Sequence, residues 1–200
     1  MAVTTSVNQA HRQALVAPLT EVAGLLQELL SRRLTAYLAG ASDGETVSRW
    51  VSGEISKIRD HEVERRLRTA YEIAQLLRAK ASAEVVRTWF INLDPNLDDT
   101  VPADAIREGR FREALTAAQK FLTSGSVLPR PRAASEVDAL LASFPEVARV
   151  GRAVYGDHAL YTAILRPAAR FGGQSAAELL RQGRADEVVS AFAGDYEGIA

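Results

Sequence analysis

Residues 34–54 read LTAYLAGASDGETVSRWVSGE, two short amphipathic stretches joined by a turn of small residues. Gly40 can adopt the positive φ that ends a helix, and Ala36 and Ala39 are small enough for two helices to approach closely. The second stretch has an apolar stripe at helical spacing, formed by Val47, Trp50 and Val51. The pattern predicts a helix-turn-helix, with the tryptophan as a core anchor.

In a helix-turn-helix, the N-terminal side chains of the second helix reach base edges in the DNA major groove. Four residues of the second stretch are types that hydrogen-bond to bases or phosphates, namely Thr46, Ser48, Arg49 and Ser52. Arg49 is the best candidate for a base contact, although it can instead pair with Glu45 one helical turn earlier. Asp43 and Glu45 count against DNA contact because phosphates repel carboxylates. The expected phosphate contacts come from flanking cations, which are Arg32, Arg33, Lys57 and Arg59.

Length and composition are those of a globular protein, with 200 residues, 47% hydrophobic and 24% charged. No apolar run approaches the ~18 residues of a membrane span, and the N-terminus lacks a cationic start followed by an apolar block. We therefore expect a cytoplasmic protein. The chain has no cysteine, and its three histidines are far apart in sequence, so no disulfide, metal site or cofactor is expected.

Charge is distributed unevenly along the chain, although the formal net charge is only −1. Residues 29–80 contain 10 Lys and Arg against 7 Asp and Glu, whereas residues 81–200 contain 13 against 16. The small basic excess coincides with the predicted helix-turn-helix. It favours DNA binding there, but a solvated helical surface explains it equally well.

Apolar spacing predicts an all-α fold. Residues 1–17 are polar and lack this spacing, so we expect a flexible N-terminus. Helices are expected over residues 18–31, 62–80, 82–91, 102–108 and 110–122, then from Ser135, where Asp138 suggests a capping box, and from Pro145 through Tyr155. A short extended segment before Pro102 is the main exception.

The stretch TSGSVLPRPRAAS, residues 123–135, is rich in Pro, Gly and Ser and is typical of a linker. It divides the chain near residue 130. The predicted organisation is then a helix-turn-helix domain (18–80), a small helical domain (81–122), the linker, and a second helical module (136–200).

An internal repeat links the two halves. LDDTVPADAIREGR at residues 97–110 and FGGQSAAELLRQGR at residues 171–184 share Ala, an acid, an apolar Ile or Leu, then Arg, Gly and Arg in register. The offset is 74 residues throughout. Helix, glycine stop and helix is a common pattern that can arise independently, but the register favours a true duplication.

Residues 30–122 resemble the antitoxins of the Xre/MbcA/ParS type, which join an Xre-like helix-turn-helix to a small helical toxin-binding domain. The resemblance lies in LTAYLAGASDGETVSRWVSGE, RRLRTAYEIAQLL and VVRTWFINLDPNLDDTVPADAIREG. The run VYGDHALYTAILRPAARFGGQSAAELLRQGRADEVVSAF is similar to the same toxin-binding domain again. A two-copy arrangement is implied.

The resemblance implies a protein that binds and blocks a RES-domain toxin consuming NAD, and that represses its own operon. It implies toxin contacts at Arg107, Gly109, Gly172, Gly173, Arg181 and Gly183. The chain departs from the family pattern in three places. The turn between the helices is about one residue longer, Asp98-Asp99 replaces the glycine pair in the first copy, and Ala176 replaces the proline in the second.

Two alternatives remain open. The chain can be a helix-turn-helix transcription regulator without a toxin, using its C-terminal half to dimerise or to sense a ligand. An enzyme is disfavoured because the sequence contains no phosphate loop or nucleophile elbow, so no catalytic residue is assigned. Two-fold binding to DNA predicts a homodimer or a higher oligomer, with Leu25 and Leu29 as candidate interface residues.

Overall fold

The chain forms two compact units, Met1–Pro129 and Arg130–Ala200, and their boundary lies inside the predicted linker. The computed structural model describes residues 2–125, 128 and 130–197. Both units are helical, as predicted. Within these ranges, extended backbone is paired at one isolated antiparallel bridge, between Asp94 and Thr100, in the segment before Pro102. Among the helices described, none is both long enough and apolar enough to cross a membrane.

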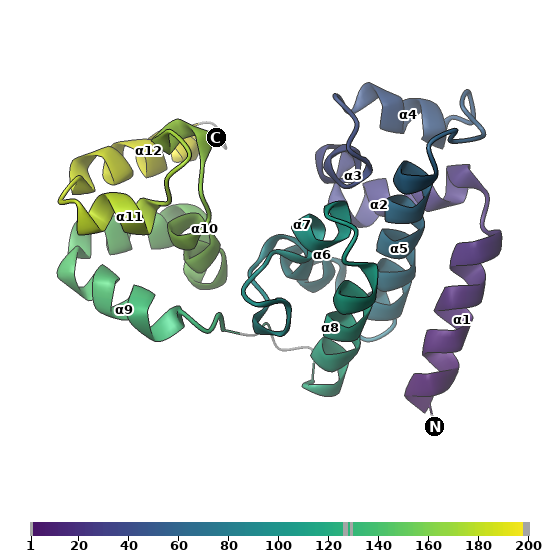
Figure 1. The fold of residues 1–200 in the computed structure, drawn as a ribbon, viewed down its shortest axis with the longest axis horizontal. Coiled ribbons are helices and arrows are strands. Elements are labelled where there is room, and N and C mark those ends of the chain that lie inside the picture. Colours follow the sequence, from purple (N-terminus) through teal and green to yellow (C-terminus); the bar gives the residue numbers. More distant parts are fainter. Residues whose placement is uncertain (1, 126–127, 129, 198–200) are drawn as a thin grey trace. The chain divides into compact units, whose positions relative to one another are not determined.

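The first unit is built around one long central helix, α5 (Figure 1). Its elements are α1 (Ala2–Val16), α2 (Leu19–Leu30), α3 (Arg32–Ala39), α4 (Glu45–Val51), α5 (His61–Arg78), α6 (Ala83–Ile91), the 3-10 turn η1 (Pro95–Leu97), α7 (Pro102–Arg107) and α8 (Phe111–Thr123). Helix α5 contacts α1, α2, α3, α6, α7 and α8. Because neighbours surround it, apolar side chains are buried along most of its length.

Helix α1 corrects the expectation of a flexible N-terminus. Residues 2–16 form a helix that packs along α5. Ala10 and Ala14, one helical turn apart, are buried, so the two backbones can approach closely. Arg68 of α5 donates through Nη1 to the carbonyl oxygen of Ala14 at 2.6 Å. The sequence conceals this helix because its buried stripe is made of alanines among polar residues.

The first unit has no domain boundary near residue 80, where the sequence suggested one. Helix α2 packs against α6, α3 against α7, and α5 against α8. The segments expected as separate domains, residues 18–80 and 81–122, therefore share one core. Leu25 and Leu29 are part of it, with exposed fractions of 8% and 6%, so they do not supply a dimer surface.

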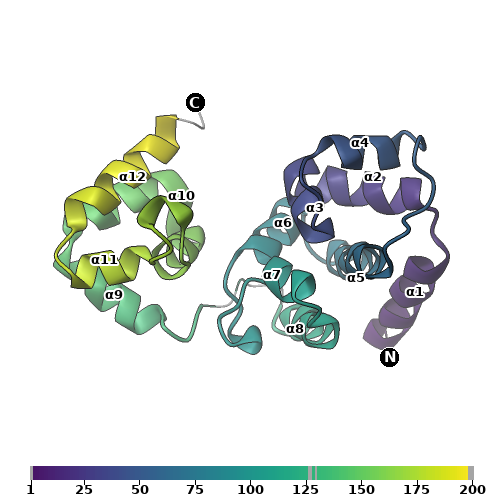
Figure 2. The ribbon, with the colours of Figure 1, turned by 45° about the horizontal axis from the view of Figure 1, so that its top comes forward.

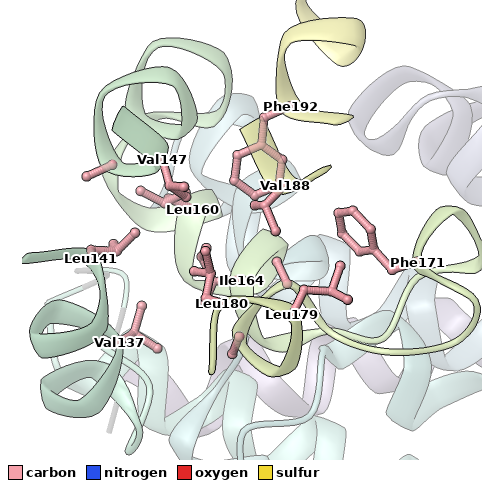
Figure 3. Close-up of a cluster of buried hydrophobic side chains, with 13 residues drawn as sticks. Val137, Leu141, Val147, Leu160, Ile164, Phe171, Leu179, Leu180, Val188 and Phe192 are labelled. Atoms are coloured by element: carbon pink, nitrogen blue, oxygen red, sulfur yellow. The ribbon is translucent and has the colours of Figure 1, made fainter. Parts of the chain in front are cut away.

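The second unit is a smaller helical bundle. Its elements are α9 (Ala134–Ser143), α10 (Pro145–Leu165), the 3-10 turn η2 (Ala169–Phe171), α11 (Ala176–Arg181) and α12 (Ala185–Glu197). Figure 3 shows its core, in which side chains from α9 to α12 point toward one another. Leu179 and Leu180 of α11 meet Leu160 and Ile164 of α10 and Phe192 of α12 in this cluster.

Two helix starts in this unit differ from prediction. The capping box expected at Ser135 and Asp138 is wrong, because α9 begins one residue earlier and its N-cap makes no side-chain hydrogen bond. A capping box forms instead at Ser175 and Glu178, where α11 begins. Helix α10 starts at Pro145, as predicted, and its helical conformation is interrupted at Gly156 (φ 70°, ψ 177°), next to the predicted end.

The internal repeat is present in the structure and is longer than the sequence indicates. Elements η1 and α7 begin and end 74 residues before η2 and α11, and α8 begins 74 residues before α12. The same offset carries α6 onto residues 157–165, the part of α10 that follows Gly156. A series of four elements, residues 83–123, therefore recurs as residues 157–197. A chance likeness between two short motifs does not explain this agreement.

The turn after the 3-10 element keeps its backbone conformation despite different residues. Asp98 and Asp99 both have φ 56°, while Gly172 and Gly173 have φ 65° and 87°. The backbone hydrogen bonds also correspond, because the N–H of Asp99 and the N–H of Gly173 each donate to a carbonyl five residues earlier, at 3.1 and 3.0 Å. Aspartate is among the residues that tolerate the left-handed region. The departure from the glycine pair thus preserves the turn.

Candidate nucleic-acid interface

Helices α3 and α4 are joined by a tight turn, and local chemistry defines both of its ends. Helix α3 ends at Gly40 (φ 78°), whose N–H bonds back to the last turn of the helix. The Oδ1 of Asp43 accepts from the backbone N–H groups of Glu45 and Thr46, at 3.0 and 3.2 Å. Asp43 therefore caps the first turn of α4.

The inner side of α4 is anchored on α2. Val47 and Trp50 are buried, with exposed fractions of 0% and 4%, and Val51 is half-buried. Ala36 and Ala39 of α3 are also buried. Figure 2 shows α4 lying along α2, in agreement with their packing contacts. The tryptophan is thus a core residue, as predicted.

The predicted contact residues of α4 are not buried. Arg49 and Ser52 are exposed, while Thr46 and Ser48 are half-buried. The four flanking cations are also exposed: Arg32, Arg33, Lys57 and Arg59. The polar side of α4 is therefore available to a partner.

Arg49 does not pair with Glu45. Its Nε donates to Oε1 of Glu54 at 2.8 Å, and the side chains are 47% and 59% exposed. An exposed ion pair of this kind contributes at most about 1 kcal/mol. A phosphate or base edge can therefore displace Glu54 at little cost.

A cleft of about 680 Å³ opens beside the turn, and we call it the arginine cleft. Arg32, Arg33 and Ser48 line it, together with Arg107 of α7. Nη1 of Arg32 lies 3.5 Å from Oγ of Ser48. The sequence identified the first three as DNA contacts but assigned Arg107 to a toxin surface, so the structure brings together residues that were predicted to act apart.

A second cleft, of about 470 Å³, is lined by Lys57 and Arg59 together with Thr46 of α4, and we call it the lysine cleft. Ala41 and Ser42 of the turn line both clefts. Cations therefore border α4 in two places, and polar side chains of α4 line both: Glu45 and Ser48 in the arginine cleft and Thr46 in the lysine cleft.

Carboxylates in the arginine cleft reduce its positive charge only in part. Hydrogen bonds from the Thr46 N–H, and next from the Ser42 hydroxyl, lower the pKa of Asp43. Its carboxylate is thus engaged in capping α4, while Glu45 is exposed. Within the ranges that the structure describes, the three arginines of the cleft form no ion pair with a carboxylate.

The residues implied as toxin contacts fall in both units. Arg107 and Gly109 belong to the first unit, and the other four belong to the second. Each glycine has a conformational reason to be present, because all four have positive φ in turns that follow η2, α7 or α11. Arg181 forms an ion pair with Glu136 of α9.

Comparison with protein-family models, curated proteins and solved structures finds no match for this chain. In the described part of the chain, no three His, Cys, Asp or Glu side chains are grouped so that they can hold a metal ion.

Proposed function

We propose that the chain binds DNA through α4 and represses transcription of its own operon. The observation that supports this best is the polar side of α4, exposed between an arginine cleft and a lysine cleft. Arg49 and Ser52 then face base edges, and the flanking cations neutralise phosphates. Binding as a dimer or higher oligomer would engage two half-sites and raise the affinity.

We further propose that the protein is an antitoxin that occludes a RES-domain toxin. The support is the resemblance of residues 30–122 to that class, together with the second copy of its helical series at residues 157–197. Blocking a toxin in this way is steric and electrostatic, so it needs no catalytic residue and no cofactor.

Gel shifts on the DNA upstream of the protein's own reading frame test the first part. The wild type should bind this fragment more tightly than a scrambled fragment of equal length. Arg49→Ala should reduce that preference by about fivefold or more, since a good base contact is worth about 1–3 kcal/mol. Arg112→Ala on α8 removes the same charge from an exposed position outside both clefts and should preserve the preference. An unchanged preference in Arg49→Ala would reject α4 as the recognition helix.

Co-expression tests the antitoxin role separately. A RES-domain protein encoded next to this chain should co-purify with it, and growth should be rescued when both are made. Operator binding without rescue or co-purification would favour the second candidate, a transcription regulator that has no toxin. The exposed side of α4 is shared by both candidates, so only the partner separates them.

A further inference from the structure

Arg107 reaches the α3–α4 pair from a different part of the first unit, because α7 packs against α3. Its guanidinium lies over the ring of Tyr37, with Cζ 4.4 Å from the ring centroid, and Nη1 is 3.5 Å from the Tyr37 carbonyl oxygen. A guanidinium has five N–H donors in a planar fork. Stacking therefore holds this cation in place while leaving most of its donors available.

Helix α7 also fixes the aromatic ring that supports the arginine. The hydroxyl of Tyr37 donates to Oδ1 of Asp104 at 2.5 Å, and Asp104 lies one helical turn before Arg107. The ring is thus held at its hydroxyl and covered on one face by the same helix. Because the guanidinium is already positioned, it loses less conformational entropy on binding than a free surface arginine.

Arg32 and Arg33 bring two more cations to the same cleft from the first turn of α3. The stem of Arg32 lies close to the turn, since a Cβ added at Gly44 would be 3.0 Å from its Cγ. Three guanidinium groups therefore border the cleft against the carboxylates of Asp43 and Glu45, one of which caps α4. Three positive charges therefore face two negative ones, and the cleft favours an anionic ligand.

We propose that Arg107 binds one backbone phosphate of a DNA strand lying beside α4, and that Arg32 and Arg33 bind neighbouring phosphates of that strand. The inference rests on the proposed DNA binding and adds to it a contact from outside the helix-turn-helix segment. The planar fork of arginine suits phosphate oxygens, which it can bind in bidentate fashion. Such a contact adds affinity for every duplex and carries no sequence information.

The second copy of the repeat lacks this site. Arg181 occupies the position equivalent to Arg107, but it forms an ion pair with Glu136. The phosphate contact is therefore a property of the first copy, whose α7 lies against α3.

Salt titration of DNA binding tests this contact. A labelled 24-bp duplex of random sequence is titrated by fluorescence anisotropy between 50 and 200 mM KCl. Each phosphate contact contributes about −0.9 to the slope of log K against log salt. Arg107→Gln should make the slope less steep by that amount. The ratio of the wild-type affinity to the variant affinity should then be about 3.5-fold smaller at 200 mM KCl than at 50 mM KCl. Arg107→Lys should restore most of the slope because it keeps the charge.

Arg112→Gln is the matched control, since it removes one exposed positive charge from α8 outside the cleft. Its slope should equal that of the wild type. An unchanged slope in Arg107→Gln, or an equal loss in Arg112→Gln, would overturn the inference. The inference would also be overturned if the wild type bound inorganic pyrophosphate tightly and Arg107→Gln abolished that binding without changing the salt slope for DNA. Failure of the wild type to bind any duplex at 50 mM KCl would instead reject the proposed function.

Discussion

Replacing Leu180 with alanine tests whether the two compact units unfold independently. Leu180 is 1% exposed in the core of the second unit (Figure 3). The substitution removes three carbon atoms, worth about 2.4 kcal/mol at roughly 0.8 kcal/mol each. The cavity left behind raises the expected loss to about 3–4 kcal/mol. A unit of about 70 residues has a total stability of about 4–10 kcal/mol, so the second unit should melt roughly 20–25 °C lower.

The tryptophans make the two units distinguishable, because Trp50 and Trp89 both lie in the first unit. Tryptophan fluorescence should therefore be unaffected by Leu180→Ala, while far-UV circular dichroism should show an earlier partial loss of helix. Ile106→Ala is the matched variant, since Ile106 is buried at the equivalent position of the first unit. It should shift the fluorescence transition. An equal shift of that transition in Leu180→Ala would show that the units unfold as one body.

Three further substitutions test local interactions. Burial, followed by the hydrogen bond to Asp195, raises the pKa of Tyr155 to about 12. Its stabilising contribution should therefore be present below about pH 10 and be lost as the pH rises toward 12. Tyr155→Phe should make the melting temperature less dependent on pH over this range, and parallel profiles of wild type and variant would contradict the assignment. Trp89→Phe removes the buried hydrogen bond from Nε1 to Asp94 at 3.0 Å. The free energy of unfolding, measured in urea, should fall by about 1–3 kcal/mol. A fall below about 0.5 kcal/mol would show that the bond contributes little. Ser175→Ala removes the N-cap of α11 and should lower the free energy of unfolding by about 1 kcal/mol. Ser175→Thr keeps a capping hydroxyl and should largely avoid this loss. No loss in Ser175→Ala would show that the capping box does not stabilise the unit.

The sequence predicted most helices because their signals are local. Apolar residues at helical spacing, proline at a helix start and glycine at a helix end all act within a few residues. The predicted helix at residues 82–91, for example, is observed as α6 (Ala83–Ile91), capped by Ser82 as expected. The stripe of Val47 and Trp50 likewise predicted which side of α4 is buried.

The missed features depend on contacts between distant residues. Helix α1 is stabilised against α5 by buried alanines, and an alanine stripe is a weak periodic signal. The partner of Arg49 is Glu54, beyond the end of its helix, rather than Glu45 within it. The arginine cleft depends on Arg107 lying over Tyr37, seventy residues away in sequence. No local pattern predicts that approach, so the candidate site was only partly visible in the sequence.

The aspartates at positions 98 and 99 have a consequence for how such proteins are detected. A search for the second glycine pair would count one helical module in this chain, although the backbone contains two. In this chain the positive φ angles of the turn and the spacing of the helix starts reveal the copy that the residue letters conceal. A chain with a single glycine pair can therefore contain two copies of the module.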